Sequence, residues 1–371
     1  MRFSVEKSTM FDAIQQVAKV APARSTLPIL NCILFTAEDN QLTLRTTDLE
    51  ITMQTSIPVM VEESGKVAIP ARFISEITAE LQESTLHFEM DEDLQVELQT
   101  ESGDYTITGK DPEEFPALPV MDDQQTVDIP NDLLTRLIDK TSFAVSRDEL
   151  KPALTGVLFQ FRESDIRGVA TDGHRLVRCI RTDTNSPNFQ GDVIIPTKFL
   201  NIVNSNLSQD GTTNLQVGEN HVKIEFDDSL IYTRIIDERF PDYESVIPSD
   251  NELEVMADAD EMIASLKRVN IFANKSTHQV TMAFEQNKLT ISAENPENNS
   301  SAQEEVNIQF GGESITLGYN AMYVMDILRH LDTKQVLLKL KSPISAGLIF
   351  PSEQQEDEDI TMLLMPIRLN D

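Results

Sequence analysis

The residues best suited to chemistry in this sequence form one short run, Ala170-Thr171-Asp172-Gly173-His174-Arg175-Leu176. Asp172 and His174 are of the types that serve as a general acid/base pair or as two metal ligands. A zinc site needs three or four ligands, and the five His and two Cys of the chain show no metal-ligand spacing. A nucleophile elbow, a phosphate-binding glycine loop and a dinucleotide fingerprint are also absent from the sequence. We therefore expect a protein that is not an enzyme and needs no metal or cofactor. A hydrolase using Asp172 and His174 remains the catalytic alternative.

The same run is typical of a strand that ends in a tight turn at Asp172-Gly173. Asp48 and Asn295 end similar alternating segments, 124 residues before and 123 residues after Asp172. In this interpretation Asp172 caps its own backbone, and Asp48 does the same. The other two segments have no counterpart of Gly173 to Leu176. We therefore expect these four residues to serve a function specific to the middle of the chain.

Three further landmarks repeat at nearly the same period, which predicts three tandem similar domains. Strand residues recur 124 residues apart, and a Pro after a large apolar residue recurs 125 residues apart. An apolar pattern at i, i+1, i+4 and i+8 predicts one buried helical face in each third. We predict an α+β fold with domains at 1–122, 123–249 and 250–371, each with two helices packed on antiparallel sheets. The landmarks are Leu34, Leu158 and Met282; Phe115-Pro116, Phe240-Pro241 and Met365-Pro366; and the helical residues Phe73, Ile74, Ile77, Leu81, then Phe199, Leu200, Val203, Leu207, then Tyr323, Val324, Ile327, Leu331.

The net charge of −32 at pH 7 argues against an ordinary DNA-binding protein, because such proteins are basic. The acidic residues gather in expected loops and edges, such as 89–93, 111–114 and 353–359, whereas the expected helical segments 196–208 and 266–275 contain no acid. This pattern fits either an ordinary solvated surface or a surface that repels DNA except along one lining.

Composition predicts a globular protein of the cytoplasm. The chain is 40% hydrophobic and shows neither a signal-peptide pattern nor an apolar run of the roughly 20 residues that span a bilayer. Cys32 and Cys179 lie at strand-like apolar positions, so we expect buried thiols in a reducing compartment.

Several segments, in the right order along the whole chain, resemble the β sliding clamp family of bacterial DNA polymerase III. The resemblance implies a non-catalytic processivity factor. Two protomers would join head to tail into a ring of six similar domains, with helices lining a hole that encircles duplex DNA. Such a ring would tether the polymerase III catalytic subunit, the clamp loader, and other polymerase, mismatch-repair and ligation proteins through short peptides. The segments are Ala170 to Leu176, Arg239-Phe240-Pro241-Asp242-Tyr243, Met365-Pro366-Ile367-Arg368-Leu369, Arg24 to Leu30, and Thr47-Asp48-Leu49-Glu50.

The resemblance also implies three sets of functional residues. For DNA-facing cations it suggests Arg24, Arg72 and Lys198, to which we add Lys267 and Arg268. For the joints of the ring it suggests Tyr105 and Ile107 against Ile271 and Phe272, although the latter pair could equally be core. For an apolar pocket that takes partner peptides on the middle and last domains, it suggests Leu154, Thr171, Gly173, His174, Arg175, Leu176, Pro241, Val246, Leu363, Leu364, Met365, Pro366, Ile367, Arg368 and Leu369.

Some features depart from that family or leave room for another function. Glu244-Ser245 stands where relatives can carry basic residues, Asn370-Asp371 extends past Leu369, and the 353–359 loop is unusually acidic. We also expect the C-terminal run to be an edge strand that completes the last sheet. An acidic scaffold that binds peptides without encircling DNA remains the alternative to a clamp.

Overall fold

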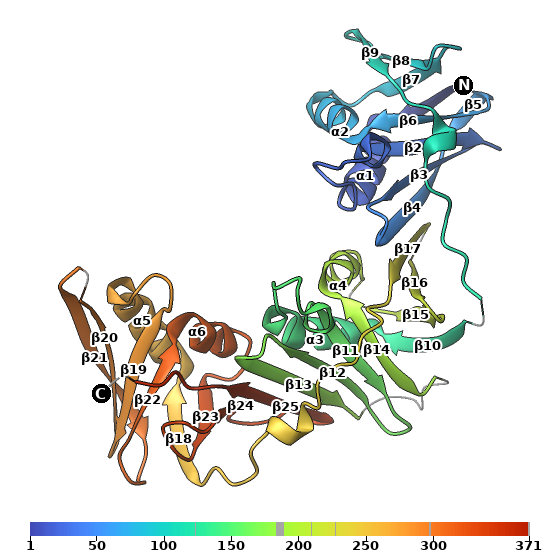
Figure 1. The fold of residues 1–371 in the computed structure, drawn as a ribbon. Coiled ribbons are helices and arrows are strands. Elements are labelled where there is room, and N and C mark those ends of the chain that lie inside the picture. The colour runs from blue at the N-terminus through green and yellow to red at the C-terminus, as the bar shows by residue number, and fades with distance from the viewer. Residues whose placement is uncertain (123, 183–188, 209, 227, 297, 370–371) are drawn as a thin grey trace. The chain divides into compact units, whose positions relative to one another are not determined.

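The structure, a computed structural model, describes residues 1–122, 124–182, 189–208, 210–226, 228–296 and 298–369. The Asn370-Asp371 extension therefore lies outside the described residues. The chain divides into two compact units, one of residues 1–131 with 201–235 and one of 132–200 with 236–371 (Figure 1). This division does not follow the thirds of the sequence, because the middle third contributes to both units.

The first unit contains two antiparallel sheets and the helices α1 (Lys7–Ala18) and α2 (Ala71–Glu80). The five-stranded sheet has the order β5 (Met60–Glu63), β1 (Arg2–Glu6), β7 (Thr85–Met90), β8 (Gln95–Gln99) and β9 (Asp104–Thr108). The eight-stranded sheet has the order β10 (Gln125–Pro130), β15 (Thr212–Val217), β16 (His221–Phe226), β17 (Ser229–Arg234), β4 (Ile51–Pro58), β3 (Gln41–Thr47), β2 (Cys32–Glu38) and β6 (Gly65–Pro70).

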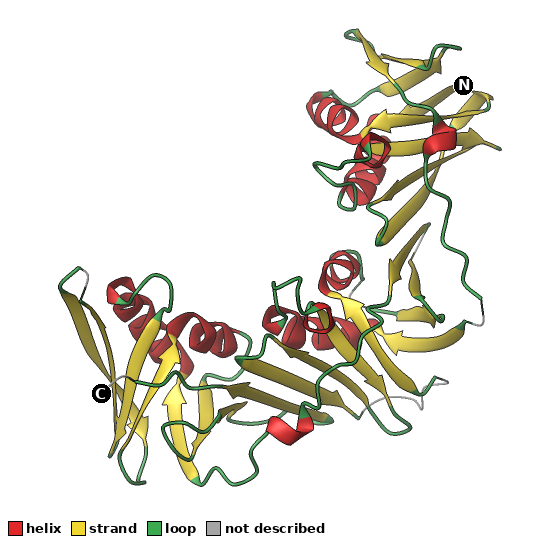
Figure 2. Cartoon of the chain, viewed as in Figure 1, coloured by secondary structure: helices red, strands yellow, loops and turns green. Residues whose placement is uncertain are grey.

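The second unit contains one antiparallel sheet of twelve strands, with α3 (Asn131–Thr141), α5 (Ala259–Val269) and α6 (Ala321–Arg329) along one side of it (Figure 2). Helix α4 (Thr197–Asn204) crosses the division between the units. The strand order is β14 (Gly191–Pro196), β11 (Gly156–Phe161), β12 (Ile166–Thr171), β13 (Arg175–Arg181), β25 (Glu358–Leu364), β24 (Gly347–Pro351), β23 (Gln335–Leu340), β18 (Leu253–Asp258), β21 (Ser300–Gln309), β20 (Lys288–Asn295), β19 (Gln279–Glu285) and β22 (Ile315–Asn320).

The predicted triplication is confirmed by the order of the elements. In each third a helix is followed by an antiparallel hairpin, β2–β3, β11–β12 or β19–β20, and a second helix follows a later strand directly. Leu34, Leu158 and Met282 occupy the first strand of the three hairpins. The thirds are joined by long-range pairing, since β17 pairs with β4 in one unit and β13 with β25 in the other.

The predicted buried face of α2 is wrong at one position. Ile74 is fully buried and Leu81 nearly so, but Phe73 is 62% exposed. The residues that accompany Ile74 on the inner face are Ala71 and Thr78. The buried Thr78 hydroxyl has a hydrogen-bond partner there, because it donates to the Ile74 carbonyl oxygen at 2.6 Å. Adjacent helical residues point about 100° apart, and Phe73 points outward, although the equivalent Phe199 of α4 is buried beside Leu200.

The prediction of an edge strand for the C-terminal run is wrong for its first residues, Leu363 and Leu364, whereas Ile367 forms an isolated bridge to Gly318 of the edge strand β22. β25 lies inside the twelve-stranded sheet, with β13 on one side and β24 on the other. Seven residue pairs join it to β13, from Arg175–Leu364 to Arg181–Glu358. The last strand of the chain therefore connects the middle third to the last third.

Both cysteines are free and buried, as the sequence predicts. Cys32 lies on β2 and Cys179 on β13. Burial raises the pKa of the Cys179 thiol to about 12, and the neighbouring Glu358 carboxylate adds to the effect. No helix in the described part of the chain is long and apolar enough to cross a membrane.

We expect neither thiol to react with iodoacetamide in the folded protein. The thiolate is the nucleophile, and both side chains are shielded from the reagent. Raising the pH from 7 to 9 will not ionise Cys179 as it ionises a free cysteine of pKa about 8.5. Mass spectrometry should count no labels before and two labels after unfolding in guanidinium. A label at pH 9 in the folded state would contradict this packing.

Candidate functional site

The turn that joins β12 to β13 is held by its own side chains. Asp172 Oδ1 accepts hydrogen bonds from the backbone N–H groups of His174 and Arg175, both at 2.9 Å. Thr171 Oγ1 donates to the Arg175 carbonyl oxygen at 2.6 Å and accepts from the Gly173 N–H at 3.1 Å. Gly173 has φ = +90°, a conformation that favours glycine. The predicted self-capping of the turn is confirmed.

The hydrogen bonds of Asp172 argue against the hydrolase alternative. Its carboxylate binds backbone N–H groups, as does Asp48, which accepts from Glu50 and Ile51 at 3.1 and 2.7 Å. A carboxylate held in this way stabilises a turn in both thirds. The described residues contain no group of three or more His, Cys, Asp and Glu that could hold a metal ion.

Arg175 is buried, and its guanidinium is bound on every side. Nε donates to Asp172 Oδ2 at 3.1 Å, Nη1 to Asp326 Oδ2 at 3.0 Å, and Nη2 to the Phe143 carbonyl oxygen at 2.7 Å. The guanidinium carbon also lies 5.3 and 4.5 Å from the ring centres of Phe143 and Tyr323, within cation–π range. Arg175 thus fastens the turn to the short helix η3 (Ser142–Ala144), which contains Phe143, and to α6.

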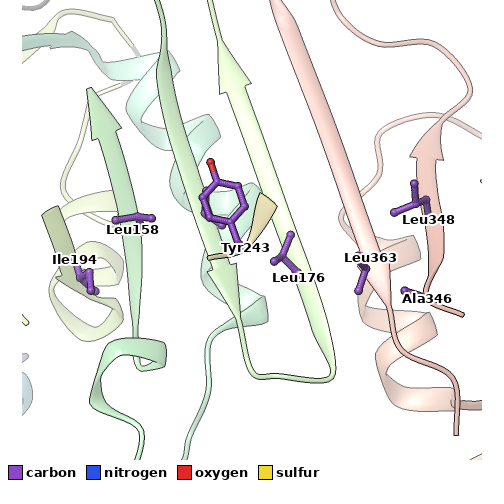
Figure 3. Packing of buried hydrophobic residues seen from close by; sticks show 8 residues of the cluster. Leu158, Leu176, Ile194, Tyr243, Ala346, Leu348 and Leu363 are labelled. Atoms are coloured by element: carbon purple, nitrogen blue, oxygen red, sulfur yellow. The ribbon is translucent and has the colours of Figure 1, made fainter. Parts of the chain in front are cut away.

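A strip of buried apolar side chains crosses six neighbouring strands (Figure 3). Residues opposite each other in a register point to the same face of a sheet, because side chains alternate along each strand. One side chain from each strand enters the strip, and we call this group the apolar cluster. In strand order its members are Ile194, Leu158, Val169, Leu176, Leu363 and Leu348, with Tyr243 and Ala346 added from outside these strands.

The apolar cluster lies on the sheet face opposite to α3. Gly168 points the other way from Val169, and a Cβ on Gly168 would lie 3.2 Å from Thr141 Cγ2 and 3.5 Å from Leu137 Cδ2 of α3. The helix therefore covers one face of β12, and the cluster occupies the other.

The segment that follows β17 covers part of the cluster. Tyr243 is buried in it, and Phe240 and Ile247 pack against it partly exposed. The Tyr243 hydroxyl donates to Gln160 Oε1 at 2.6 Å, which satisfies the polar end of the ring. Burial is also the main reason that the pKa of Tyr243 is raised.

Exposed apolar side chains continue from the cluster to the surface. Val246 is 53% exposed and directly precedes Ile247, on η5 (Glu244–Val246). Met365 and Ile344 are exposed two residues from the buried Leu363 and Ala346, respectively. The segment after β17 therefore covers part of the apolar cluster, and exposed apolar side chains follow or precede its residues in the sequence.

The residues after β25 continue as a tail fixed by two backbone hydrogen bonds. The Met365 N–H donates to the His174 carbonyl oxygen and the Ile367 N–H to the Gly318 carbonyl oxygen, both at 2.8 Å. A Cβ on Gly318 would lie 2.6 Å from the Ile367 carbonyl oxygen, so glycine allows this close approach. The exposed His174 ring stands 6.2 Å from the Tyr323 ring.

Strand alternation divides the predicted pocket residues between two faces. Leu176 and Leu363 are paired and belong to the cluster, and Thr171 is opposite Leu176. Arg175 and Leu364 are also paired but point to the other face, where Arg175 contacts α6. The remaining residues lie as follows: Leu154 is buried in η4 (Pro152–Leu154), Gly173, His174, Pro241, Val246 and Met365 are exposed, and Pro366, Ile367, Arg368 and Leu369 form the tail.

The resemblance supplied only two of the eight cluster residues, Leu176 and Leu363. Tyr243 was quoted only as part of a motif, and the other five were not predicted as pocket residues: Leu158, Val169, Ile194, Ala346 and Leu348. Their alternate spacing indicates a buried face, but only the register shows that these faces join.

Four of the five predicted DNA-facing cations lie on helices, and Arg24 lies in the loop after α1. All five are exposed. Arg72 binds Glu76 at 2.8 Å, and Arg268 binds both Glu304 carboxylate oxygens at 2.5 and 2.6 Å. These two charges are already partly neutralised within the protomer.

The predicted joint residues lie at surfaces. β9 is the edge strand of its sheet, and Tyr105 and Ile107 on it are half-buried. Ile271 is 75% and Phe272 39% exposed on η6 (Asn270–Phe272), so these two residues are not core.

The whole chain matches known sliding clamps. Models of the DNA polymerase III beta subunit match residues 1–119 with its N-terminal domain, 128–242 with its central domain and 244–368 with its C-terminal domain. The beta sliding clamp of Haemophilus influenzae is 31% identical over the full length of both chains, and that of Bacillus subtilis is 28% identical over 99% of this chain and 100% of its own.

Solved structures agree with this match. Crystal structures of the DNA polymerase sliding clamps of Pseudomonas aeruginosa and Bacillus subtilis each superpose with a TM-score of 0.92 at 27% identity, covering 100% of both chains. The triplicated α+β fold and the sequence similarity point to one family. The chain belongs to the family of DNA polymerase III beta subunits, the beta sliding clamps.

Proposed function

We propose that this protein is a sliding clamp that encircles duplex DNA as a homodimeric ring and confers processivity on DNA polymerase III without catalysing a reaction itself. The observation that supports this most strongly is the tiling of residues 1–368 by the three domains of the polymerase beta subunit, in order. The domain boundaries that we place after residues 122 and 249 remain predictions, because the family models match 1–119, 128–242 and 244–368. A cytoplasmic location follows from the proposal, because bacterial DNA lies there, and the free buried thiols agree with a reducing compartment.

A ring reconciles the charge of the chain with a DNA partner. When a protein binds DNA by neutralising phosphates, each contact makes the binding constant fall with roughly the first power of the salt concentration. A chain of net charge −32 gains little affinity from such contacts. A closed ring is retained by topology instead. Tight phosphate binding is then not required of the exposed cations, which are Arg24, Arg72, Lys198, Lys267 and Arg268.

The ring would close through two identical joints. Tyr105 and Ile107 of one protomer would contact Ile271 and Phe272 of its partner, head to tail. The edge position of β9 and the exposure of η6 support this choice. A head-to-tail contact that closes after two copies gives C2 symmetry.

Partner proteins would insert short peptides beside the apolar cluster. Val246 and Met365 offer uncovered apolar contact, and Met side chains adapt to varied partners. His174 is an exposed polar group at this surface, whereas Arg175 has its donors occupied and would hold the turn in place. Glu244 lies at the rim beside Val246 and accepts from Arg167 Nη1 at 3.3 Å, so its charge is partly neutralised within the protomer.

The topological link can be tested by retention on DNA. Protein loaded onto nicked circular DNA by a clamp loader and ATP should remain bound during gel filtration in high salt. Cutting the circle should release it, because a ring slides off a free end. Retention that does not change on cutting, or no retention at all, would favour the acidic scaffold.

The peptide site can be tested by two substitutions at exposed positions. We expect Val246→Asp and His174→Ala to raise the Kd of a fluorescent peptide from a polymerase subunit, by about tenfold for Val246→Asp, since a few anchors supply most of such binding energy. Deletion of residues 365–371 should also weaken binding. Fluorescence anisotropy would measure the Kd.

Val120→Asp is the matched control, because Val120 is 78% exposed and lies in the other unit. All variants should still sediment as dimers, whereas loading onto circular DNA should weaken together with peptide affinity, because the clamp loader is one of the proposed peptide partners. Unchanged peptide affinity in Val246→Asp and His174→Ala would remove the peptide site from this surface while leaving the ring intact.

A further inference from the structure

The first unit contains a structural counterpart of the surface to which we assign partner peptides. Its eight-stranded sheet, followed from β6 to β10, repeats the first eight strands of the twelve-stranded sheet, followed from β14 to β18. The turn between β3 and β4 also repeats the turn between β12 and β13. The Leu49 N–H donates to Thr47 Oγ1 at 3.1 Å. The Gly173 N–H donates to Thr171 Oγ1 at the same distance, so the two surfaces can be compared residue by residue.

A smaller apolar group, which we call the upstream cluster, occupies the counterpart position. Leu34 in this group pairs with Ala68 of β6 and with Arg45 of β3. The corresponding residues of the second unit are Leu158, Ile194 and Val169. The members of the upstream cluster are Ile29, Leu30, Cys32, Leu34, Ala68 and Phe115.

The upstream cluster lies on the sheet face that points away from α1. The Thr46 hydroxyl donates to the Val17 carbonyl oxygen of α1 at 2.6 Å. Its neighbour Arg45 therefore points to the opposite face, because side chains alternate along a strand. This surface is thus separate from the helices to which we assign the duplex.

Polar side chains replace the rest of the apolar cluster on this face of the first unit. Thr52 pairs with Tyr232 of β17, and Tyr232 pairs with Lys223 of β16. The Lys223 ammonium lies 5.7 Å from the Tyr232 ring centre and is paired with Glu225. In strand order, Arg45, Thr52, Tyr232 and Lys223 stand at the positions that Val169, Leu176, Leu363 and Leu348 occupy in the second unit.

Arg45 has no anionic partner in the described part of the chain, although the sequence contains 62 acidic residues. Its guanidinium carbon lies 5.4 Å from the Phe115 ring centre, and its buried Nε has no hydrogen-bond partner. Burial lowers the pKa of Arg45, so its charge is desolvated without compensation. Lys110, which forms a bridge to Ala68, likewise makes no ion pair with a described residue. A carboxylate that reached these two cations would form charge-assisted hydrogen bonds.

Two exposed leucines border the same surface. Leu27 is 50% exposed and directly precedes η1 (Pro28–Asn31), which contributes two residues to the upstream cluster. Leu49 is also 50% exposed, and its φ of +78° is one that bulky residues rarely adopt. Because Gly173 fills the counterpart position, the turn itself does not require a side chain at residue 49. Backbone strain that presents an apolar group to solvent is typical of a binding surface.

We propose that this surface of the first unit docks a short acidic peptide of a partner protein, with apolar side chains against Leu27 and Leu49 and carboxylates on Arg45 and Lys110. The inference rests on the proposed peptide site only by analogy, and it adds a second site with a different preference. A peptide fits better than a nucleic acid, because exposed leucines offer nothing to a phosphate backbone. The two surfaces would then select partners by charge, since one is apolar and the other is cationic.

A synthetic peptide of alternating Leu and Asp, labelled with fluorescein, can serve as the probe. Fluorescence anisotropy with the full chain would measure its Kd, in the presence of excess unlabelled polymerase peptide that occupies the site of the second unit. Probes with Ser in place of Leu, or with Lys in place of Asp, should bind at least about tenfold more weakly. Each comparison isolates one half of the proposed chemistry.

Two substitutions to the residue that the second unit has at the counterpart position test the site itself. We expect Arg45→Val to raise the Kd of the Leu–Asp probe about tenfold and Leu49→Gly about fivefold. Leu49→Gly relieves the positive φ, so its melting temperature should not fall and weaker binding could not be ascribed to unfolding. Lys334→Gln has the same charge change as Arg45→Val at an exposed position in the other unit, and it should leave the Kd unchanged.

Unchanged affinity in both Arg45→Val and Leu49→Gly would overturn the proposal, as would equal binding of the Ser probe. If Arg45→Val instead weakened binding of a single-stranded oligonucleotide alone, or shifted the sedimentation of the chain alone, the surface would contact nucleic acid or a second copy, and the peptide proposal would fall. The affinity of the polymerase peptide should be the same in both variants. That affinity and the retention on circular DNA test the proposed function separately, so either proposal can fail while the other stands.

Discussion

Backbone pairing between β13 and β25 sets the geometry on which the site depends. Their register assigns Leu176 and Leu363 to the apolar cluster and Arg175 and Leu364 to the helix-covered face. If β13 slipped by one residue, Arg175 would point into the apolar cluster and Leu176 would point to the helix-covered face. Burying that charge without partners would cost several kcal/mol, so the pairing and the alternation stabilise each other. The proposed peptide surface would consequently be built by the middle third and the last third together, and neither contains it alone.

Buried charges on the helix-covered face strengthen the same connection. Arg136 of α3 binds both carboxylate oxygens of Glu358 at 2.7 Å, and Glu358 is almost fully buried. Lys140 binds Asp332 at 2.7 Å and donates to the His330 carbonyl oxygen beyond α6, where a helix C-terminus attracts cations. Such pairs stabilise little relative to apolar packing, yet leaving one partner unpaired is costly. We therefore interpret them as fixing how the middle third meets the last third.

The sequence indicated local structure well and long-range structure poorly. The three repeats were found by comparing segments about 124 residues apart, and the Asp172-Gly173 turn followed from residue types alone, because a turn depends on neighbours in the chain. The interior position of β25 depends on a partner strand some 180 residues away in sequence, which no local pattern specifies. The same limit explains why the pocket prediction mixed Arg175 with Leu176. The predicted burial of Phe73 was wrong for another reason. Its apolar side chain indicated burial, but Ala71 and Thr78 complete the inner face of α2.

Net charge and local charge have separate consequences in this molecule. Residues 91–108 contain six carboxylates and no Lys or Arg, whereas residues 262–278 contain three cations and no acid. A uniformly acidic surface would repel DNA wherever the two approach each other. An uneven distribution changes this, because the potential at contact distance depends on the charges within about one Debye length of 8–10 Å. A chain of net charge −32 can therefore repel DNA at long range and still present local surfaces that do not repel it.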